Sequence, residues 1–113
     1  EFRRVLFRSA NLVIDQGATF SVDLDLTDEN GDVIDLQGYT ATSQMRKWYT
    51  STTSIPFTAS INALAGVITL SLNATQTAAI TAGRYVYDVE INNNDTVYRI
   101  IEGIVTVTPN VTR

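Results

Sequence analysis

The sequence predicts an all-β protein, an antiparallel β-sandwich of about seven strands with one short helical turn near residues 75–80. Three observations lead to this prediction. Apolar and polar residues alternate with a period of two along most of the chain. Turn-forming residues recur about every 8–12 residues, and no long segment has the 3.6-residue period of an amphipathic helix. The 113 residues suffice for one such domain.

The first half of the chain is expected to form five extended segments. Along residues 20–27 apolar and polar side chains alternate strictly, so one face should be buried and the other solvated. Asn30-Gly31 is a hairpin signal because both residues tolerate a positive φ. Pro56 suits an edge strand because it cannot donate to a ladder. The expected segments are Asn11–Asp15, Phe20–Thr27, Val33–Ile34, Tyr39–Tyr49 and Ile55–Ile61.

The second half should hold the helical turn and the longest strands. Asn73–Gly83 interrupts the alternation with Thr, Gln and Ala, which favours a helical turn stopped by Gly83. A strand should follow from Tyr85, then a loop at Asn92–Asp95, then a strand over Thr96–Thr108 in which Gly103 marks a bulge or bend. The side chains expected to point into the core are Phe20, Leu24, Phe57, Ile68, Leu70, Tyr87 and Val89.

The position of Tyr85 predicts that the sandwich is immunoglobulin-like. It begins a strand directly after a segment that should cross from one sheet to the other. In immunoglobulin-like domains a tyrosine at this place donates its hydroxyl to the backbone of the preceding loop, the tyrosine corner. We therefore predict a structural role for Tyr85, with Tyr87 as the alternative.

Composition excludes several kinds of chemistry. The chain has no cysteine and no histidine, which removes disulfides, thiolate metal sites and the commonest general base. Its formal net charge is −4, so an acidic surface should repel nucleic acid. No apolar run reaches the roughly 20 residues of a membrane span. We expect no enzyme, no cofactor, no catalytic or metal site, and no nucleic acid, membrane or small-molecule substrate as partner.

Two groups of carboxylates are candidate sites. The acidic stretch Asp23–Asp35 lacks the spacing of an EF-hand and is interpreted as a solvated face and turn, with a looser calcium or glycan site as the alternative. Asp88 and Glu90 share one strand face, as a glycosidase pair would, but no cleft is indicated. We expect them to meet arginines across strands, with Arg84, Arg46 and Arg99 as candidates.

Two segments are candidate interaction surfaces. Arg46, Lys47, Trp48 and Tyr49 are the one place where basic and aromatic residues meet. Trp48 could contact a partner, pack in the core or stack on a ligand. The carboxy-terminal segment with Val111 and Thr112 alternates apolar and polar residues and could add a strand to a neighbour's sheet.

The opening residues 1–9, "EFRRVLFRS", do not fit the domain that follows. Written as the codons GAG TTC AGA CGT GTG CTC TTC CGA TCT, they resemble a common sequencing-library adapter at every position. We therefore expect residues 1–9 to be a translated artefact of metagenomic sequencing and residues 10–113 to be the domain. A native disordered arm is the alternative.

The order and spacing of three motifs resemble a known family. "LQGYTA" (36–41), "GRYVYD" (83–88) and "VTPNVTR" (107–113) together resemble small immunoglobulin-like virion proteins of tailed bacteriophages and the amino-terminal domain of phage baseplate upper proteins. This resemblance implies a virion structural protein in a tail, baseplate or fibre, assembled in the host bacterial cytoplasm. It implies contacts with other virion proteins, self-association among them, and no catalytic residues. The alternative is an adhesion or carbohydrate-binding module.

Overall fold

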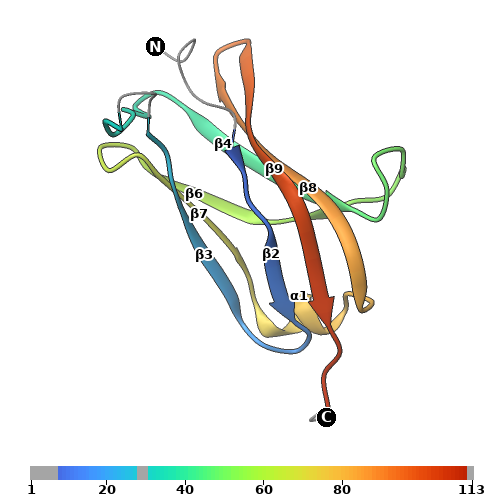
Figure 1. Cartoon of the computed structure of the whole chain (residues 1–113). Helices are drawn as coiled ribbons and strands as arrows, with labels where there is room; N and C mark the ends of the chain where they lie inside the picture. The colour runs from blue at the N-terminus through green and yellow to red at the C-terminus, as the bar shows by residue number, and fades with distance from the viewer. Residues whose placement is uncertain (1–7, 28–30, 112–113) are drawn as a thin grey trace.

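The protein is a sandwich of two β-sheets with one short helix, as the sequence predicts (Figure 1). The computed structural model describes residues 8–27 and 31–111. No helix within these ranges is long and apolar enough to cross a membrane. The elements are β1 (Arg8–Ser9), β2 (Leu12–Asp15), β3 (Phe20–Asp25), β4 (Thr40–Arg46), β5 (Ile55–Pro56), β6 (Thr58–Asn62), β7 (Val67–Leu72), α1 (Ala74–Ala78), β8 (Gly83–Asn93) and β9 (Thr96–Thr108).

The strand order is that of an immunoglobulin-like sandwich. The larger sheet runs β1-β9-β8-β4-β5, with β2 also paired to β9, and the smaller sheet runs β3-β7-β6. One feature departs from the expected antiparallel arrangement, because β1 and β2 both run parallel to β9. The chain then crosses from β2 into β3 of the other sheet, so β2 does not form a hairpin with its sequence neighbour.

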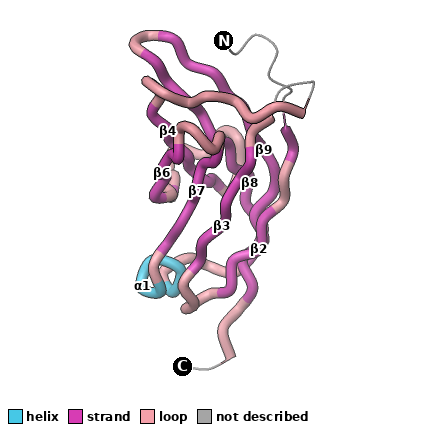
Figure 2. The backbone as a smooth tube through the Cα atoms, turned by 90° about the vertical axis from the view of Figure 1, so that its left-hand side faces the viewer, coloured by secondary structure: helices cyan, strands magenta, loops and turns pink. Residues whose placement is uncertain are grey.

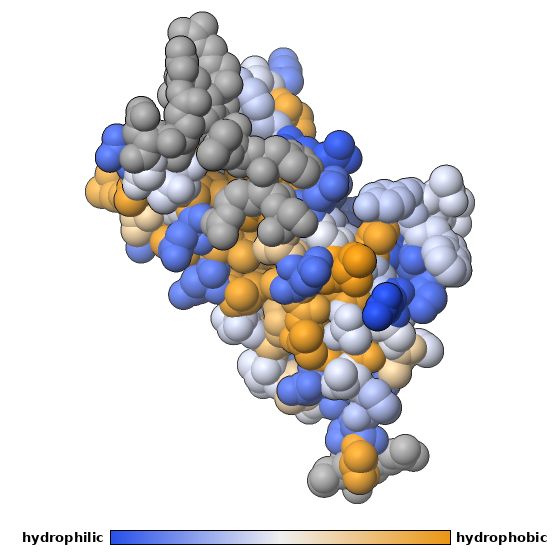
Figure 3. Space-filling model, viewed as in Figure 1, coloured by the Kyte–Doolittle hydropathy of each residue, from blue (hydrophilic) through white to orange (hydrophobic). Residues whose placement is uncertain are grey.

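The predicted core is confirmed. Six of the seven predicted core side chains are buried, and Phe20 is half-buried at the rim, its ring centroid 6.0 Å from that of Phe57. Asp23 and Asp25 are exposed on β3 whereas Leu24 is buried, so the assigned register is correct. In the space-filling view, apolar side chains gather in the region between β2 and β3, with hydrophilic residues around them (Figure 3).

The expected strand over residues 55–61 is two strands in different sheets. Ile55 and Pro56 pair with β4 at the edge of the larger sheet, as predicted for Pro56. Buried Phe57 donates its backbone N–H to the Ser43 carbonyl at 2.9 Å, and Thr58 then starts β6 in the smaller sheet. The side-chain alternation is unbroken across this crossing, which is why periodicity alone predicts one strand.

The helical turn is present, but Gly83 does not end it. Asn73 caps α1 by accepting from the Gln76 N–H at 2.8 Å, and the Gln76 side chain accepts from the Asn73 N–H at 2.8 Å. The helix ends at Ala78, and Gly83 is the first residue of β8 with φ 144°. Thr77 fixes the turn to the sandwich because its buried hydroxyl donates to the Ala18 carbonyl at 2.8 Å. Figure 2 shows α1 at the end of the sandwich nearer the carboxy terminus.

The region before β4 is less regular than expected. The predicted strand Val33–Ile34 is reduced to a single bridge between Thr27 and Val33. Asn30 of the predicted hairpin turn lies outside the described residues, whereas Gly31 has the expected positive φ of 84°. The strand predicted to reach Tyr49 ends at Arg46.

Gly103 is needed for a close approach of two backbones, not for a bulge. The β8–β9 register shifts opposite Val89 and Glu90, which leaves Ile100 as the extra residue. A Cβ at Gly103 would lie 2.0 Å from the Ala10 carbonyl oxygen. The same oxygen accepts from the Tyr87 hydroxyl at 2.6 Å, and the Ala10 N–H donates to the Glu102 carbonyl at 3.0 Å.

Part of the opening segment lies in the sheet. Arg8 and Ser9 pair in parallel with Ile101 and Glu102 of β9, so these two residues extend the ladder begun by β2. This pairing uses backbone groups, which any non-proline residue supplies. Residues 1–7 lie outside the described residues.

Leu70→Ala should lower the free energy of unfolding by about 2–5 kcal/mol, because it opens a cavity at a fully buried position. Chemical denaturation measures this loss. Leu64→Ala is the matched control, since Leu64 is 73% exposed and should change stability by less than about 0.5 kcal/mol. Equal losses in the two variants would contradict the assigned core.

Gly103→Ala should destabilise the domain by about 1–3 kcal/mol, because the new methyl group meets backbone that must move. Val97→Ala on the same strand serves as the control, since Val97 is exposed. Thermal unfolding of both variants would measure the difference. An unchanged melting temperature for Gly103→Ala would show that the Ala10 backbone does not lie against Gly103.

Candidate functional site

The outer face of the larger sheet is the candidate site. On β4 and β8 the inward side chains, among them Met45, Tyr87 and Val89, are buried against the smaller sheet. Their neighbours therefore point to the opposite face, where no second layer of the described chain covers them. The residues of this outer face include Thr42, Gln44, Arg46, Arg84, Val86, Asp88, Glu90, Arg99, Glu102 and Ile104.

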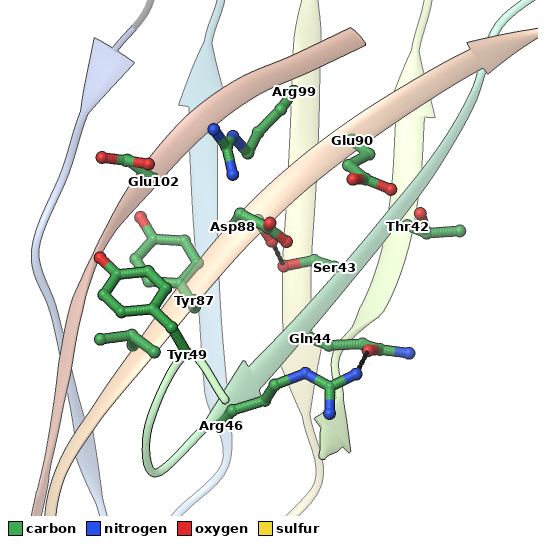
Figure 4. Close-up of a pocket in the computed structure, with 11 residues that line it drawn as sticks. Thr42, Ser43, Gln44, Arg46, Tyr49, Tyr87, Asp88, Glu90, Arg99 and Glu102 are labelled. Atoms are coloured by element: carbon green, nitrogen blue, oxygen red, sulfur yellow. Dashed lines mark hydrogen bonds between the residues drawn. The ribbon is translucent and has the colours of Figure 1, made fainter. Parts of the chain in front are cut away.

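A shallow polar hollow of about 310 Å³ lies at the centre of the outer face (Figure 4). Tyr49 lies on one side of it and Glu90 on the other. In the sheet register Glu90 stands opposite Arg99, as predicted, so these opposite charges are cross-strand neighbours. Asp88 stands directly between Gln44 and Glu102 in the register, and Arg99 lines the same hollow beside it (Figure 4). The backbone of Asp88 also takes part, because its carbonyl accepts from the Ser43 hydroxyl at 2.6 Å.

The loop after β4 is closed on itself. Arg46 donates a hydrogen bond from one terminal guanidinium nitrogen to the Ser51 carbonyl at 2.7 Å. The other terminal nitrogen donates to the Gln44 side-chain oxygen at 3.1 Å. The Trp48 N–H donates to the Ser51 hydroxyl at 3.0 Å, and the Ser51 N–H returns to the Trp48 carbonyl at 3.1 Å. Arg46 is therefore a residue that shapes the loop, and the loop holds its aromatic residues in a defined place.

An exposed apolar area borders the polar hollow. We call Trp48, Tyr49, Val86 and Ile104 the aromatic patch; they line a hollow of about 410 Å³ together with Lys47, Thr50, Arg84 and Tyr85. Trp48 is 66% exposed and Tyr49 73% exposed. The alternative that Trp48 packs in the core is therefore wrong. Trp48 stands two residues after Arg46, which lies on the outer face, so continued alternation would also place Trp48 outside the core.

Lys47 connects the aromatic patch to the core. Its ammonium group lies 5.0 Å from the centroid of the Tyr85 ring and 6.0 Å from that of Trp48, within the range of a cation–π contact. The same ammonium lies 2.8 Å from where a Cβ at Gly83 would be, so glycine there leaves room for the lysine. Lys47 thus lies between the Trp48 ring and the Tyr85 ring of β8 and contacts both.

Tyr85 makes the contact that defines a tyrosine corner. Its hydroxyl donates to the Thr81 carbonyl at 2.6 Å, across the loop that joins α1 to β8. Burial raises the pKa of Tyr85 above its ordinary value of 10.0. Tyr87, the alternative, donates to Ala10 instead and joins β8 to the segment before β2.

Sequence reasoning missed two members of the aromatic patch. Val86 and Ile104 are directly opposite each other in the β8–β9 ladder, on the outer face. The sequence contained a signal for Ile104. Val105 and Val107 are buried, so the alternation points Ile104 outward, where a large apolar side chain is unusual; it is 41% exposed. Neither position could be linked to Trp48 without the pairing of β4 with β8.

The carboxy-terminal segment forms a separate surface. Val111 is 93% exposed, and the backbone just before it is held because the Asn110 N–H donates to the Gln16 side chain at 3.1 Å. This segment lines a hollow with Asp15 and Pro109 that shares no residue with the aromatic patch. Thr112 lies outside the described residues.

The acidic stretch gathers no metal ligands in the described chain. Over residues 8–27 and 31–111 no three Asp or Glu side chains are grouped so as to hold an ion. Asp23 accepts from the Thr69 hydroxyl at 2.7 Å, and Asp35 accepts from the Gln37 N–H at 2.9 Å. Asp28 and Glu29 lie outside the described residues.

Tyr85→Phe should lower the free energy of unfolding by about 1 kcal/mol, because it leaves the Thr81 carbonyl without this donor. Since the pKa of Tyr85 is raised in the folded state, its contribution is present below about pH 10 and is lost as pH rises through the raised value. Stability should therefore fall less steeply in alkali for Tyr85→Phe than for the wild type. Tyr49→Phe, at an exposed position, is the control in both denaturation series.

Comparisons with known proteins support the fold alone. No protein-family model and no curated protein matches the chain. Among solved structures, InlP of Listeria monocytogenes is similar, with a TM-score of 0.52 and 20% sequence identity over 90% of this chain. The chain spans 28% of the length of that InlP chain. At this level of identity the likeness extends to the arrangement of strands and not to what InlP does.

Proposed function

We propose that this domain is a structural module that works through protein–protein contact, with the aromatic patch as its main contact surface. The observation that carries the proposal is the exposure of Trp48 and Tyr49 on a loop that its own hydrogen bonds hold closed. Tryptophan and tyrosine are enriched among residues that dominate binding energy. A loop already fixed in place loses little entropy when a partner binds.

The charges around the aromatic patch favour an acidic partner surface. Lys47 and Arg84 border the patch, although the whole chain carries a formal charge of −4. A partner that offers an apolar pocket ringed by carboxylates would therefore match the patch in shape and charge. The acidic β3 face would repel the same partner, so the charges also select which side of the module is used.

We further propose that this contact places the module in the virion of a tailed bacteriophage. The support is the resemblance of "LQGYTA", "GRYVYD" and "VTPNVTR", in that order, to phage virion proteins of immunoglobulin-like fold. The module would be assembled in the host cytoplasm with other tail, baseplate or fibre proteins. Its task would be to occupy a place in the assembly.

A second candidate function is carbohydrate binding, and one observation favours it. Tyr49 lines both the aromatic patch and the polar hollow, so an aromatic ring stands beside the polar groups of Gln44 and Glu90. A sugar has apolar and hydroxyl-bearing faces that could use both. The sequence alone does not reveal this pairing, because Tyr49 and Glu90 are distant along the chain.

Incorporation into particles tests the proposed function. Cells that carry the phage genome would express a tagged copy of the chain, and purified particles would be assayed for the tag. Trp48→Ala should reduce incorporation about tenfold or more, as expected for loss of a dominant contact. Leu64→Ala, which truncates an equally exposed side chain elsewhere, should leave incorporation unchanged.

Two results would redirect the proposal. Particles that lack the protein, although the infected cells contain it, would exclude the virion role. Binding to a glycan array that Tyr49→Ala abolishes would favour the carbohydrate alternative, and the absence of such binding would remove it.

A further inference from the structure

We propose that the free edge of β6 pairs with β6 of a second copy of this chain, in antiparallel register about Ser60. The two smaller sheets would then form one continuous sheet of order β3-β7-β6-β6-β7-β3. This inference concerns a different surface from the aromatic patch and does not depend on a role in a virion.

The first argument is the chemistry of the outermost strands. Proteins protect sheet edges with charged residues, proline or very short strands. The other outermost strands of the described chain carry such features: β3 has Asp23 and Asp25, β5 is two residues long and contains Pro56, β1 is also two residues long, and β2 ends in Asp15. The β6 strand is five residues long, "TASIN", with neither a charge nor a proline.

The second argument is that, within residues 8–27 and 31–111, no strand pairs with one side of β6. Its five residues pair with β7 from Thr58 opposite Ser71 to Asn62 opposite Val67, and β6 is the last strand of its sheet. The opposite side of its backbone therefore presents N–H and C=O groups that an extended strand can pair with.

The third argument identifies the partner as a second copy. Antiparallel pairing about Ser60 sets Ser60 opposite its own counterpart, Thr58 opposite Asn62, and Ala59 opposite Ile61. The polar side chains are those exposed on the outer face, whereas Ala59 and Ile61 are half-buried against the core. Each polar residue therefore meets a polar one, and the small Ala59 leaves space for the larger Ile61. A pairing that maps a strand onto itself closes with twofold symmetry.

Charge gives the fourth argument. Two copies with a formal charge of −4 each repel one another in most orientations. Association through β3 would bring Asp23 and Asp25 of two copies together. The β6 edge carries no charge and avoids this repulsion, so it is the edge through which two identical copies can approach each other.

The first measurement is self-association of the full chain by sedimentation velocity and by NMR over a concentration series. A five-residue edge buries little area, so we expect a weak dimer with a Kd on the order of 0.1–1 mM. Concentration-dependent amide shifts should be largest in residues 58–62. A chain that stays monomeric at protein concentrations of several millimolar, roughly, would overturn the proposal.

Charge variants then test the register. Ser60→Lys and Ser60→Glu should each raise the Kd about tenfold or more, because like charges come to face each other across the twofold axis. An equimolar mixture of S60K and S60E should associate again, since the charges across the axis are then opposite. The matched control is Ser21→Lys on β3, an exposed serine at the other edge of the same sheet, which should leave association unchanged. If S21K weakens the dimer as much as S60K, or the mixture does not recover, the proposed edge is wrong.

A cross-linking variant gives an independent test that does not need a stable dimer. The chain has no cysteine, so Ser60→Cys introduces a single thiol. Mild oxidation should convert S60C to a covalent dimer at least several-fold faster than S21C, because the two positions 60 face each other at the axis. Circular dichroism would first establish that each variant is folded. Equal rates for folded S60C and S21C would overturn the pairing about Ser60.

Discussion

The antiparallel pairing of β8 with β9 is the interaction on which the rest of the structure depends. Its residues on one side, among them Tyr87, Val89 and Val105, fill the core, and those on the other side form the floor of the outer face. The ladder also supplies β9 as the partner of β2 and β8 as the partner of β4. A slip of one residue would turn the core side chains outward, so core and outer face are fixed by the same register.

Contacts at both ends of β2 join this strand to the rest of the fold. At Gly103 the absence of a side chain lets the Ala10 carbonyl lie against β9, and Tyr87 holds it there by donating to that carbonyl. At the other end, Thr77 and Gln16 bind α1 to the turn between β2 and β3. The first contact lies where the chain runs along β9, and the second lies where it leaves the larger sheet for the smaller one. Hydrogen bonds at both places suit a module that must present fixed surfaces.

The two surfaces proposed for binding differ in their physics. The aromatic patch offers large apolar side chains on a closed loop, and such a surface favours a tight contact with a dissimilar partner. The β6 edge offers backbone groups and small side chains over a short length, which favours a weak contact between two copies of the chain. A module with both could be recruited by one contact and arranged in several copies by the other.

The sequence by itself determined the sandwich, the inward and outward positions on each strand, and the place of the helical turn. These follow from alternation and turn residues, which are local properties. The separation of β5 from β6, the bulge at Ile100 and the role of Gly103 were not predictable, because each depends on which strand lies alongside. The same holds for the candidate site. The segment Arg46–Tyr49 stood out by composition, but only the pairing of β4 with β8 and of β8 with β9 brought Val86 and Ile104 to it. Residues far apart in a chain become neighbours through tertiary pairing, and no local pattern records that pairing.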